Sequence, residues 1–161
     1  MTRYISDSHT YGESYLHLQF TPKKRRKAFQ DTKVLQETRN QFTKKSRELG
    51  ITLIVAEFGP DHCHLFLQNW KNYSIPQLAQ FLKGSSSHAL RAQFHNLRLA
   101  VDSKSFWTDG YFYETVGSVT AQAREFYIRR CQGKHWKNIE YPEWSKEQTQ
   151  LTKFIREPSA L

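Results

Sequence analysis

Cysteine is scarce in this sequence, with only Cys63 and Cys131 among 161 residues. The two form no Cys-x-x-Cys pair, and two thiols are too few for the disulfide framework of a small secreted domain. No apolar run approaches the roughly 20 residues that a membrane-spanning helix needs. The N-terminal residues also lack the apolar segment of a signal peptide. These absences favour a reducing compartment, so we expect a cytoplasmic protein.

Acidic residues are in deficit as well. The chain has 15 Asp and Glu against 24 Lys and Arg, which gives a formal net charge of +9. A surplus of this size favours a polyanionic partner, most commonly a nucleic acid, over a merely basic soluble protein. The contents of hydrophobic residues (38%) and aromatic residues (14%) predict a folded globule, and the length suits one domain.

The pattern of apolar residues switches between strand and helix periods. Strand patterns cover 14–20, 51–58, 62–68 and 106–115, and helix patterns cover 31–49, 74–94, 118–132 and 145–156. We expect the polar residues 1–13 to form a loose arm and 95–105 to form a loop. The order predicts an α+β domain over 14–132, with a ferredoxin-like or RRM-like antiparallel sheet and helices on one face. We expect 133–161 to be a C-terminal helical extension.

Local signals mark the ends of the first two helices. Gly50 is a natural stop for the first, and Ser74 with Gln77 forms a capping box at the start of the second. The second helix must cross the unusual run 84–87, Gly-Ser-Ser-Ser. The first helix is expected to face the core through one stripe, made of Val34, Leu35, Thr38, Phe42, Lys45 and Leu49.

The most informative motif is His62-Cys63-His64. In a strand, residues i and i+2 point to the same face, so both imidazoles project together while Cys63 points into the core as a small hydrophobe. Two histidines on one face of a central strand can bind one divalent metal ion. The alternative is a chance pair of surface histidines.

Tyr127 lies in the helix pattern of 118–132, close to three arginines. A tyrosine in a helix is usually a residue at the edge of the core. Here Arg124, Arg129 and Arg130 would suit a phosphate group nearby. A phenol has a pKa of about 10, so it needs a metal ion or a base to act as a nucleophile.

A basic run directly follows the first predicted strand, and it consists of Lys23, Lys24, Arg25, Arg26 and Lys27. Such a run can be a solvated loop. At the edge of a sheet in a chain of this charge, contact with phosphates is the better interpretation. Among the aromatic residues further on, Trp107, Tyr111 and Tyr113 could stack on bases or pack in the core, while Phe112 is expected in the core.

These motifs together resemble a known family. The segment 59–67, Gly-Pro-Asp-His-Cys-His-Leu-Phe-Leu, looks like the HUH motif, histidine–hydrophobe–histidine. The wider pattern resembles the single-tyrosine transposases of the insertion-sequence 200/605 family. Segments 21–26, 81–86, 106–112 and 115–117 carry the resemblance, which covers roughly 14–132.

The resemblance implies a mechanism. His62 and His64 would bind a divalent metal ion, Mg²⁺ or Mn²⁺, that polarises the scissile phosphate. Tyr127 would attack the phosphorus, forming a 5′-phosphotyrosine that a 3′-hydroxyl later resolves without ATP. Family members are homodimers with active sites shared between subunits, act on single-stranded DNA with hairpin ends, and occur in bacteria and archaea. The DNA contacts would come from the basic run, from Lys83 in segment 81–86, and from the arginines around Tyr127.

One position departs from the family pattern. The family supplies a third metal ligand, a glutamine four residues after the tyrosine, where this chain has Cys131. Gln132 is five residues on, which rotates it about 100° out of that register. A π-bulge or a frayed helix end could bring Gln132 round; Cys131 could serve, although thiolate suits Mg²⁺ poorly; or no third side chain is used. We expect Gln132.

Two other functions compete with a mobile-element transposase. A domesticated HUH nuclease would perform the same cleavage on chromosomal palindromes. A non-catalytic RRM-like module would bind nucleic acid through the open sheet face, but the sequence has no RNP-like segment on a strand. A structural zinc site is a weaker idea, because such sites use four closely spaced Cys or His ligands.

Overall fold

The computed structural model describes residues 5–7, 9–100 and 104–117 of the chain. The strands are β1 (Ile5–Asp7), β2 (Thr10–Gly12), β3 (Tyr15–Phe20), β4 (Thr52–Gly59), β5 (His62–Gln68) and β6 (Phe112–Val116). The helices are α1 (Thr32–Leu49), α2 (Ile75–Gln93) and α3 (His95–Ala100), with short 3-10 turns η1 (Lys23–Arg25) and η2 (Ala28–Gln30). The predicted helix within 118–132 and the extension 133–161 lie outside the described residues.

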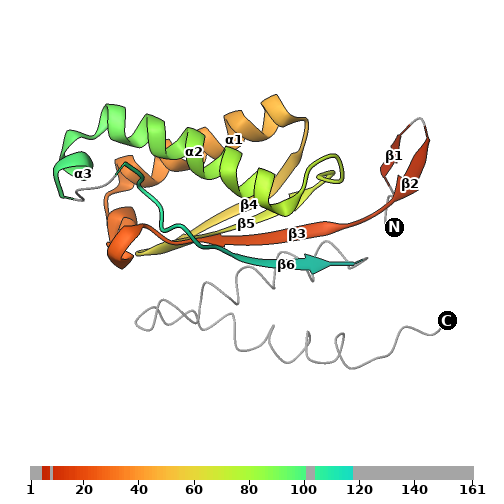
Figure 1. The fold of residues 1–161 in the computed structure, drawn as a ribbon, viewed down its shortest axis with the longest axis horizontal. Coiled ribbons are helices and arrows are strands. Elements are labelled where there is room, and N and C mark those ends of the chain that lie inside the picture. The colour runs from red at the N-terminus through yellow and green to blue at the C-terminus, as the bar shows by residue number, and fades with distance from the viewer. Residues whose placement is uncertain (1–4, 8, 101–103, 118–161) are drawn as a thin grey trace, which may run out of the picture.

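Four strands form one antiparallel sheet in the order β4-β5-β3-β6. The chain passes through β3, α1, β4, β5, α2 and β6, so the two central strands, β3 and β5, are separated in sequence by α1 and β4. Helices α1 and α2 cover the same face of the sheet (Figure 1). This is the predicted α+β, ferredoxin-like plan, and it is confirmed. No helix in the described ranges is long and apolar enough to cross a membrane.

The alternation of side chains along β3 and β5 separates the two faces of the sheet. The residues that point to the helices are fully buried, and they are Leu16, Leu18 and Phe20 from β3 with Cys63, Leu65 and Leu67 from β5. The prediction that Cys63 packs in the core is therefore confirmed. Burial also raises the pKa of the Cys63 thiol, which makes it a poor metal ligand and a poor nucleophile.

Helix α1 ends at Gly50 as expected, but its buried stripe differs at one position. Asp31 accepts a hydrogen bond from the Lys33 backbone at the start, and Gly50 ends the helix in the left-handed region with a φ of 70°. The stripe continues from Phe42 to Ser46, which is buried, because residues four apart stay nearly in register. The expected inward position of Lys45 is wrong, because its ammonium forms an ion pair with the carboxylate of Glu48.

Helix α2 begins at the predicted capping box of Ser74 and Gln77. Its serine run has a structural purpose. The indole Nε1 of Trp107 donates to Ser86 Oγ at 2.9 Å, and the backbone N–H of Phe106 donates to Ser87 Oγ at 2.8 Å. The helix therefore fastens the segment that leads into β6.

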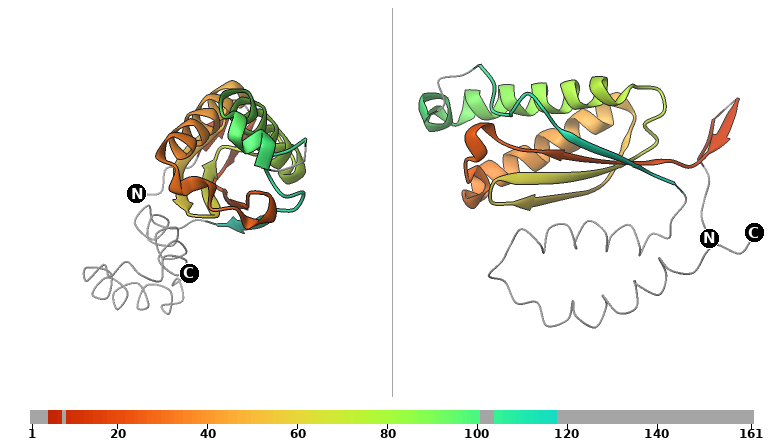
Figure 2. Two further views of the ribbon diagram at one scale, coloured as in Figure 1. Left: turned by 90° about the vertical axis from the view of Figure 1, so that its left-hand side faces the viewer. Right: turned by 60° about the horizontal axis from the view of Figure 1, so that its bottom comes forward.

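Three expectations about the rest of the chain are wrong. Within the part of 1–13 that the structure describes, β1 and β2 pair as a small antiparallel ribbon that projects beyond β3 (Figures 1 and 2). The expected loop 95–105 begins with α3. The expected strand 106–115 is shorter, because Trp107 makes an isolated bridge with Pro22 and the regular pairing starts at Phe112.

Of two aromatic residues, Trp107 takes one of its two expected alternatives, and Phe112 differs from expectation. Trp107 is fully buried against Phe20 and Phe42, so it is a core residue and offers no face to a base. Phe112, expected in the core, is 49% exposed. It lies on the strand at the sheet edge and on the face opposite α1 and α2.

Replacing Ser86 by alanine tests the link between α2 and the 106–107 segment. Ser86→Ala leaves the buried Trp107 N–H without its acceptor, so we expect a loss of about 1–3 kcal/mol in the free energy of unfolding, measured by urea denaturation. Ser85→Ala is the matched control, because the Ser85 hydroxyl donates to Leu82 within the same helix; its expected change is below about 0.5 kcal/mol. Equal losses in the two variants would contradict the assignment.

Candidate metal and nucleic-acid site

His62 and His64 lie side by side on β5, on the sheet face away from the helices. Their ring centroids are 5.0 Å apart with an interplanar angle of 85°. This confirms that both imidazoles project to one face. Both residues are buried, with exposures of 2% and 1%, so the alternative of a chance pair of surface histidines is wrong.

Asp61 holds the ring of His62. The Asp61 Oδ1 and His62 Nδ1 atoms are 2.9 Å apart. A carboxylate can only accept, so Nδ1 carries the proton and the lone pair is on Nε2. Burial opposes the charged form of Asp61, but the contacts with His62 and Arg25 outweigh it, and the pKa of Asp61 is lowered. The sequence places Asp61 inside the HUH-like segment 59–67 but does not by itself pair its carboxylate with His62.

Gly59 makes room for the same ring. It pairs with His62 across the β4–β5 hairpin. A Cβ atom added at Gly59 would lie 2.2 Å from His62 Cε1 and 2.7 Å from Nδ1. A side chain cannot fit there, so glycine is needed because the ring packs directly on the backbone.

A third histidine, His17 of β3, contacts His64. The His17 Nε2 and His64 Nδ1 atoms are 2.9 Å apart, and both rings are buried. On the other side of His17, its Nδ1 lies 3.8 Å from the carboxylate of Glu114 on β6. Burial lowers the pKa of His17, and the nearby carboxylate partly offsets this. The period of two in the expected strand 14–20 puts His17 on the face opposite Leu16 and Leu18, but the sequence alone does not pair His17 with His64.

The donor set fits a divalent metal ion. The carboxylate of Asp61 sets Nε2 of His62 as a potential ligand, and His64 has its Nδ1 occupied by His17 in the same way. Neutral imidazoles with Nδ1 held by a hydrogen-bond partner are the usual form of histidine ligands. Among the described residues, no group of three or more His, Cys, Asp or Glu could hold a metal ion. A metal ion at His62 and His64 would therefore need further ligands besides these two imidazoles.

The basic run adjoins the histidines. Lys24 and Arg25 in η1 adopt left-handed backbone conformations, with φ values of 58° and 50°. The turn is held by the Lys23 N–H, which donates to the Phe106 carbonyl at 2.9 Å. The Arg25 Nε lies 3.8 Å from the second oxygen of Asp61. One carboxylate thus contacts both the basic run and His62, which places positive charge beside the candidate metal site.

Lys83, an expected DNA contact, is used elsewhere. Its ammonium donates to the carbonyls of Thr108, Asp109 and Gly110 at 2.6, 3.0 and 3.2 Å. These three bonds account for the three donors of an ammonium group. Burial lowers the pKa of Lys83, while Asp109 opposes the change. The structure therefore gives Lys83 the role of holding the turn before β6.

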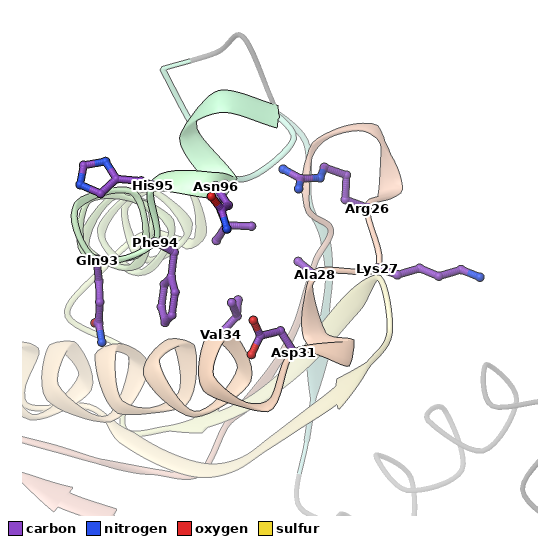
Figure 3. Close-up of a pocket in the computed structure, with 10 residues that line it drawn as sticks. Arg26, Lys27, Ala28, Asp31, Val34, Gln93, Phe94, His95 and Asn96 are labelled. Carbon is purple, nitrogen blue, oxygen red and sulfur yellow. The ribbon is translucent and has the colours of Figure 1, made fainter.

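A cavity of about 480 Å³ lies between the start of α1 and the end of α2. In Figure 3 the Arg26 guanidinium is directed toward the cavity while Lys27 points away from it. His17, His62 and His64 do not line this cavity. It is therefore separate from the candidate metal site.

The remaining expected site residues lie outside the described part of the chain, and they are Tyr127, Cys131, Gln132, Arg124, Arg129 and Arg130. Their placement relative to the histidine pair stays a prediction.

Substituting Gly59 tests whether the backbone sets the position of His62. Gly59→Ala is expected to displace the ring and weaken Mn²⁺ binding by about tenfold or more, as loss of a supporting contact does at metal sites, measured by calorimetric titration. Gly84→Ala is the matched control, because a Cβ there meets nothing within 4 Å. Unchanged Mn²⁺ affinity in folded Gly59→Ala would contradict the assignment.

The chain matches a family described as IS200-like transposases over residues 10–131. The transposase for insertion sequence element IS200 from Salmonella typhimurium is 31% identical over 119 residues, which cover 74% of this chain and 78% of that protein. The ISDra2 transposase TnpA from Deinococcus radiodurans is 29% identical over 79 residues, covering 49% of this chain and 56% of that protein.

Solved structures share the fold. A candidate transposase from Deinococcus radiodurans R1 matches with a TM-score of 0.61 at 22% identity, covering 84% of this chain and 98% of that one. A REP-associated tyrosine transposase bound to a REP hairpin matches with a TM-score of 0.56 at 17% identity, covering 81% and 74%. The family match includes the whole described sheet and all three histidines of the site, and with the Salmonella relative it shows that this chain belongs to the IS200-like transposases.

Proposed function

We propose that this transposase cuts and rejoins single-stranded DNA at hairpin-bearing ends by transesterification through Tyr127. The observation that carries the proposal is the pair of buried histidines on one sheet face, His62 and His64, each with its Nδ1 in a hydrogen bond. Membership of a transposase family supports a DNA-cleaving and DNA-rejoining enzyme. The basic run beside Asp61 supports a phosphate-bearing substrate at the same site.

In the proposed site, His62 and His64 would bind Mg²⁺ or Mn²⁺, with Gln132 as a third ligand. The bound cation would polarise the scissile phosphate and offset the charge of the transition state. The contribution of the protein is to present two neutral imidazoles from a rigid strand. Asp61 is the support for one of them, and Gly59 gives its ring space.

The proposed reaction has two steps. In the first, the phenolic oxygen of Tyr127 forms a bond to the scissile phosphorus as its proton leaves, and the bond from phosphorus to the 3′ oxygen breaks. That oxygen takes up a proton, and the 5′ end stays on the enzyme as a phosphotyrosine. In the second, the oxygen of another 3′-hydroxyl bonds to this phosphorus as its proton leaves, the bond from phosphorus to the Tyr127 oxygen breaks, and that oxygen takes up a proton. The energy of the broken bond is conserved, so no ATP is needed. Arg124, Arg129 and Arg130 would contact phosphates near Tyr127.

The DNA would be held by the basic run, in which Lys24, Arg25 and Lys27 are exposed. A hairpin substrate is proposed because the structurally similar REP-associated transposase was solved with a REP hairpin. We further propose a homodimer in which the tyrosine helix of one subunit completes the histidine site of the other, working in the cytoplasm of a bacterium or archaeon. The same chemistry on chromosomal palindromes would make the chain a domesticated nuclease.

The decisive experiment is denaturing electrophoresis of the protein with a labelled single-stranded oligonucleotide from the DNA that flanks its gene. The expected result is a slow, protease-sensitive band that requires Mg²⁺ or Mn²⁺. Tyr127→Phe should abolish this band and leave hairpin binding nearly unchanged, because the phenol oxygen is the nucleophile and the ring is retained. An undiminished band in Tyr127→Phe would refute the assignment, and binding without any band in the wild type would favour the non-catalytic module.

The two histidines can be tested in the same gel. His62→Ala and His64→Ala are each expected to lower adduct formation by at least about 100-fold with the cation limiting, because one ligand is lost and the cation is held less tightly. His88→Ala, on α2 and outside the sheet, is the control and should behave as the wild type. A wild-type rate for either β5 variant would exclude that histidine as a ligand.

The basic run makes a separate prediction about salt. Exchanging Lys24 and Lys27 for glutamine should make the negative slope of log K against log[salt] shallower by about 1.4 for a single strand. Each lost phosphate contact reduces the magnitude of this slope by about 0.7. The control variant replaces Lys33 and Lys44, which are exposed on α1, by glutamine. Its net charge changes by the same amount as that of the Lys24 and Lys27 variant. Equal slopes for the two double variants, measured by fluorescence anisotropy, would show that only overall charge matters.

A further inference from the structure

We propose that His17 and Glu114 position the HUH histidine His64, by ordering the protons along Glu114, His17 and His64 so that His64 presents the lone pair of Nε2. This inference rests on the proposed function, because it assigns His64 as a metal ligand. It adds two positioning residues from two further strands, neither of which touches the cation or the DNA in the proposed mechanism.

The three side chains form a line across three strands on the sheet face away from α1 and α2. Glu114 lies directly opposite His17 in the β3–β6 register. His17 lies opposite Phe66 in the β3–β5 register, so it reaches His64 diagonally. The two imidazole rings have centroids 5.1 Å apart and an interplanar angle of 31°. The His17 ring also makes an edge contact with Phe112 of β6, with ring centroids 5.7 Å apart.

The order of the protons follows from the carboxylate end. Glu114 can only accept, so it favours a proton on the facing Nδ1 of His17. Neutral His17 then has its lone pair on Nε2, which accepts from Nδ1 of His64 at 2.9 Å. With its proton on Nδ1, His64 has its lone pair on Nε2. The separation of 3.8 Å to Glu114 is longer than a hydrogen bond, so the carboxylate acts through its charge.

The arrangement matches the one at His62 by a longer route. The carboxylate of Asp61 contacts His62 directly, whereas the carboxylate of Glu114 acts on His64 through His17. Both ligands thereby present the same ring nitrogen. The opposite tautomer at His64 would direct an N–H at the cation instead of a lone pair, which would prevent binding by that ring. A buried imidazole at position 17 is therefore needed for its acceptor as well as for its volume.

The tautomer can be measured directly in the cation-free protein. Long-range ¹H–¹⁵N NMR of the imidazole rings at about pH 8, where an ordinary imidazole is neutral, should show His64 protonated on Nδ1. His17→Phe keeps a ring in the site and removes the acceptor. It should shift His64 toward the other tautomer and raise the Mn²⁺ dissociation constant by about 10–100-fold.

Two further variants separate positioning from packing. His17→Gln restores an acceptor through its side-chain carbonyl, so it should recover the His64 tautomer and most of the Mn²⁺ affinity. Glu114→Gln removes only the charge from a side chain that is 43% exposed, so the core should stay intact. It should shift the His64 tautomer and raise the Mn²⁺ dissociation constant in the same direction as His17→Phe, but by less. Glu57→Gln is its matched control, because Glu57 lies opposite His64 on β4 and outside the line.

The outcomes for this inference and for the proposed function differ. A wild-type His64 protonated on Nε2, or a folded His17→Phe with unchanged tautomer and Mn²⁺ affinity, overturns the positioning role even if the DNA adduct forms. If His17→Phe does not fold, the His64 tautomer is compared in His17→Gln and Glu114→Gln. A wild-type tautomer in His17→Gln with a shift in Glu114→Gln supports the positioning role, and an unchanged tautomer in Glu114→Gln overturns it. The expected tautomer shifts without any DNA adduct would leave the positioning role standing and refute the proposed reaction.

Discussion

The register between β3 and β5 is the constraint on which both faces of this protein depend. It sets Phe20 opposite Cys63 and Gln19 opposite His64. Because side chains alternate, this one pairing sends the apolar residues of both strands to the helices and brings His17 within hydrogen-bond distance of His64 on the other face. A slip of one residue would turn the histidines into the core and the leucines outward. Burial of the apolar face therefore also fixes the geometry of the polar face.

The helix layer acts on the site indirectly. Ser86, Ser87 and Lys83 of α2 bind the segment that runs from Phe106 to the turn before β6. The position of β6, and so the place of Glu114 beside His17, follows from these bonds on the far side of the sheet. The serine run and the lysine are thus explained by packing, although a basic residue in a chain of net charge +9 invites assignment to DNA.

The supports of the two candidate metal ligands, His62 and His64, differ in how local they are. Asp61 and Gly59 belong to the same hairpin as His62, so the tight turn brings them together with little help from the rest of the fold. The support of His64 comes from two strands that are distant in sequence. The family assignment covers all these elements, and the site is accordingly a property of the assembled sheet rather than of the three-residue motif.

The sequence by itself determined what depends on neighbouring residues. The period of two in 62–68 put His62 and His64 on one face and Cys63 in the core. Gly50 marked the end of α1, and the capping box at Ser74 marked the start of α2. Tertiary structure decided which side chains meet across strands: His17 with His64, the Lys83 ammonium with three carbonyls, and Trp107 with Ser86. It also decided that Phe112 is half exposed at the sheet edge. The physical reason is that strand pairing joins residues far apart in sequence, and local periodicity carries no information on register between strands.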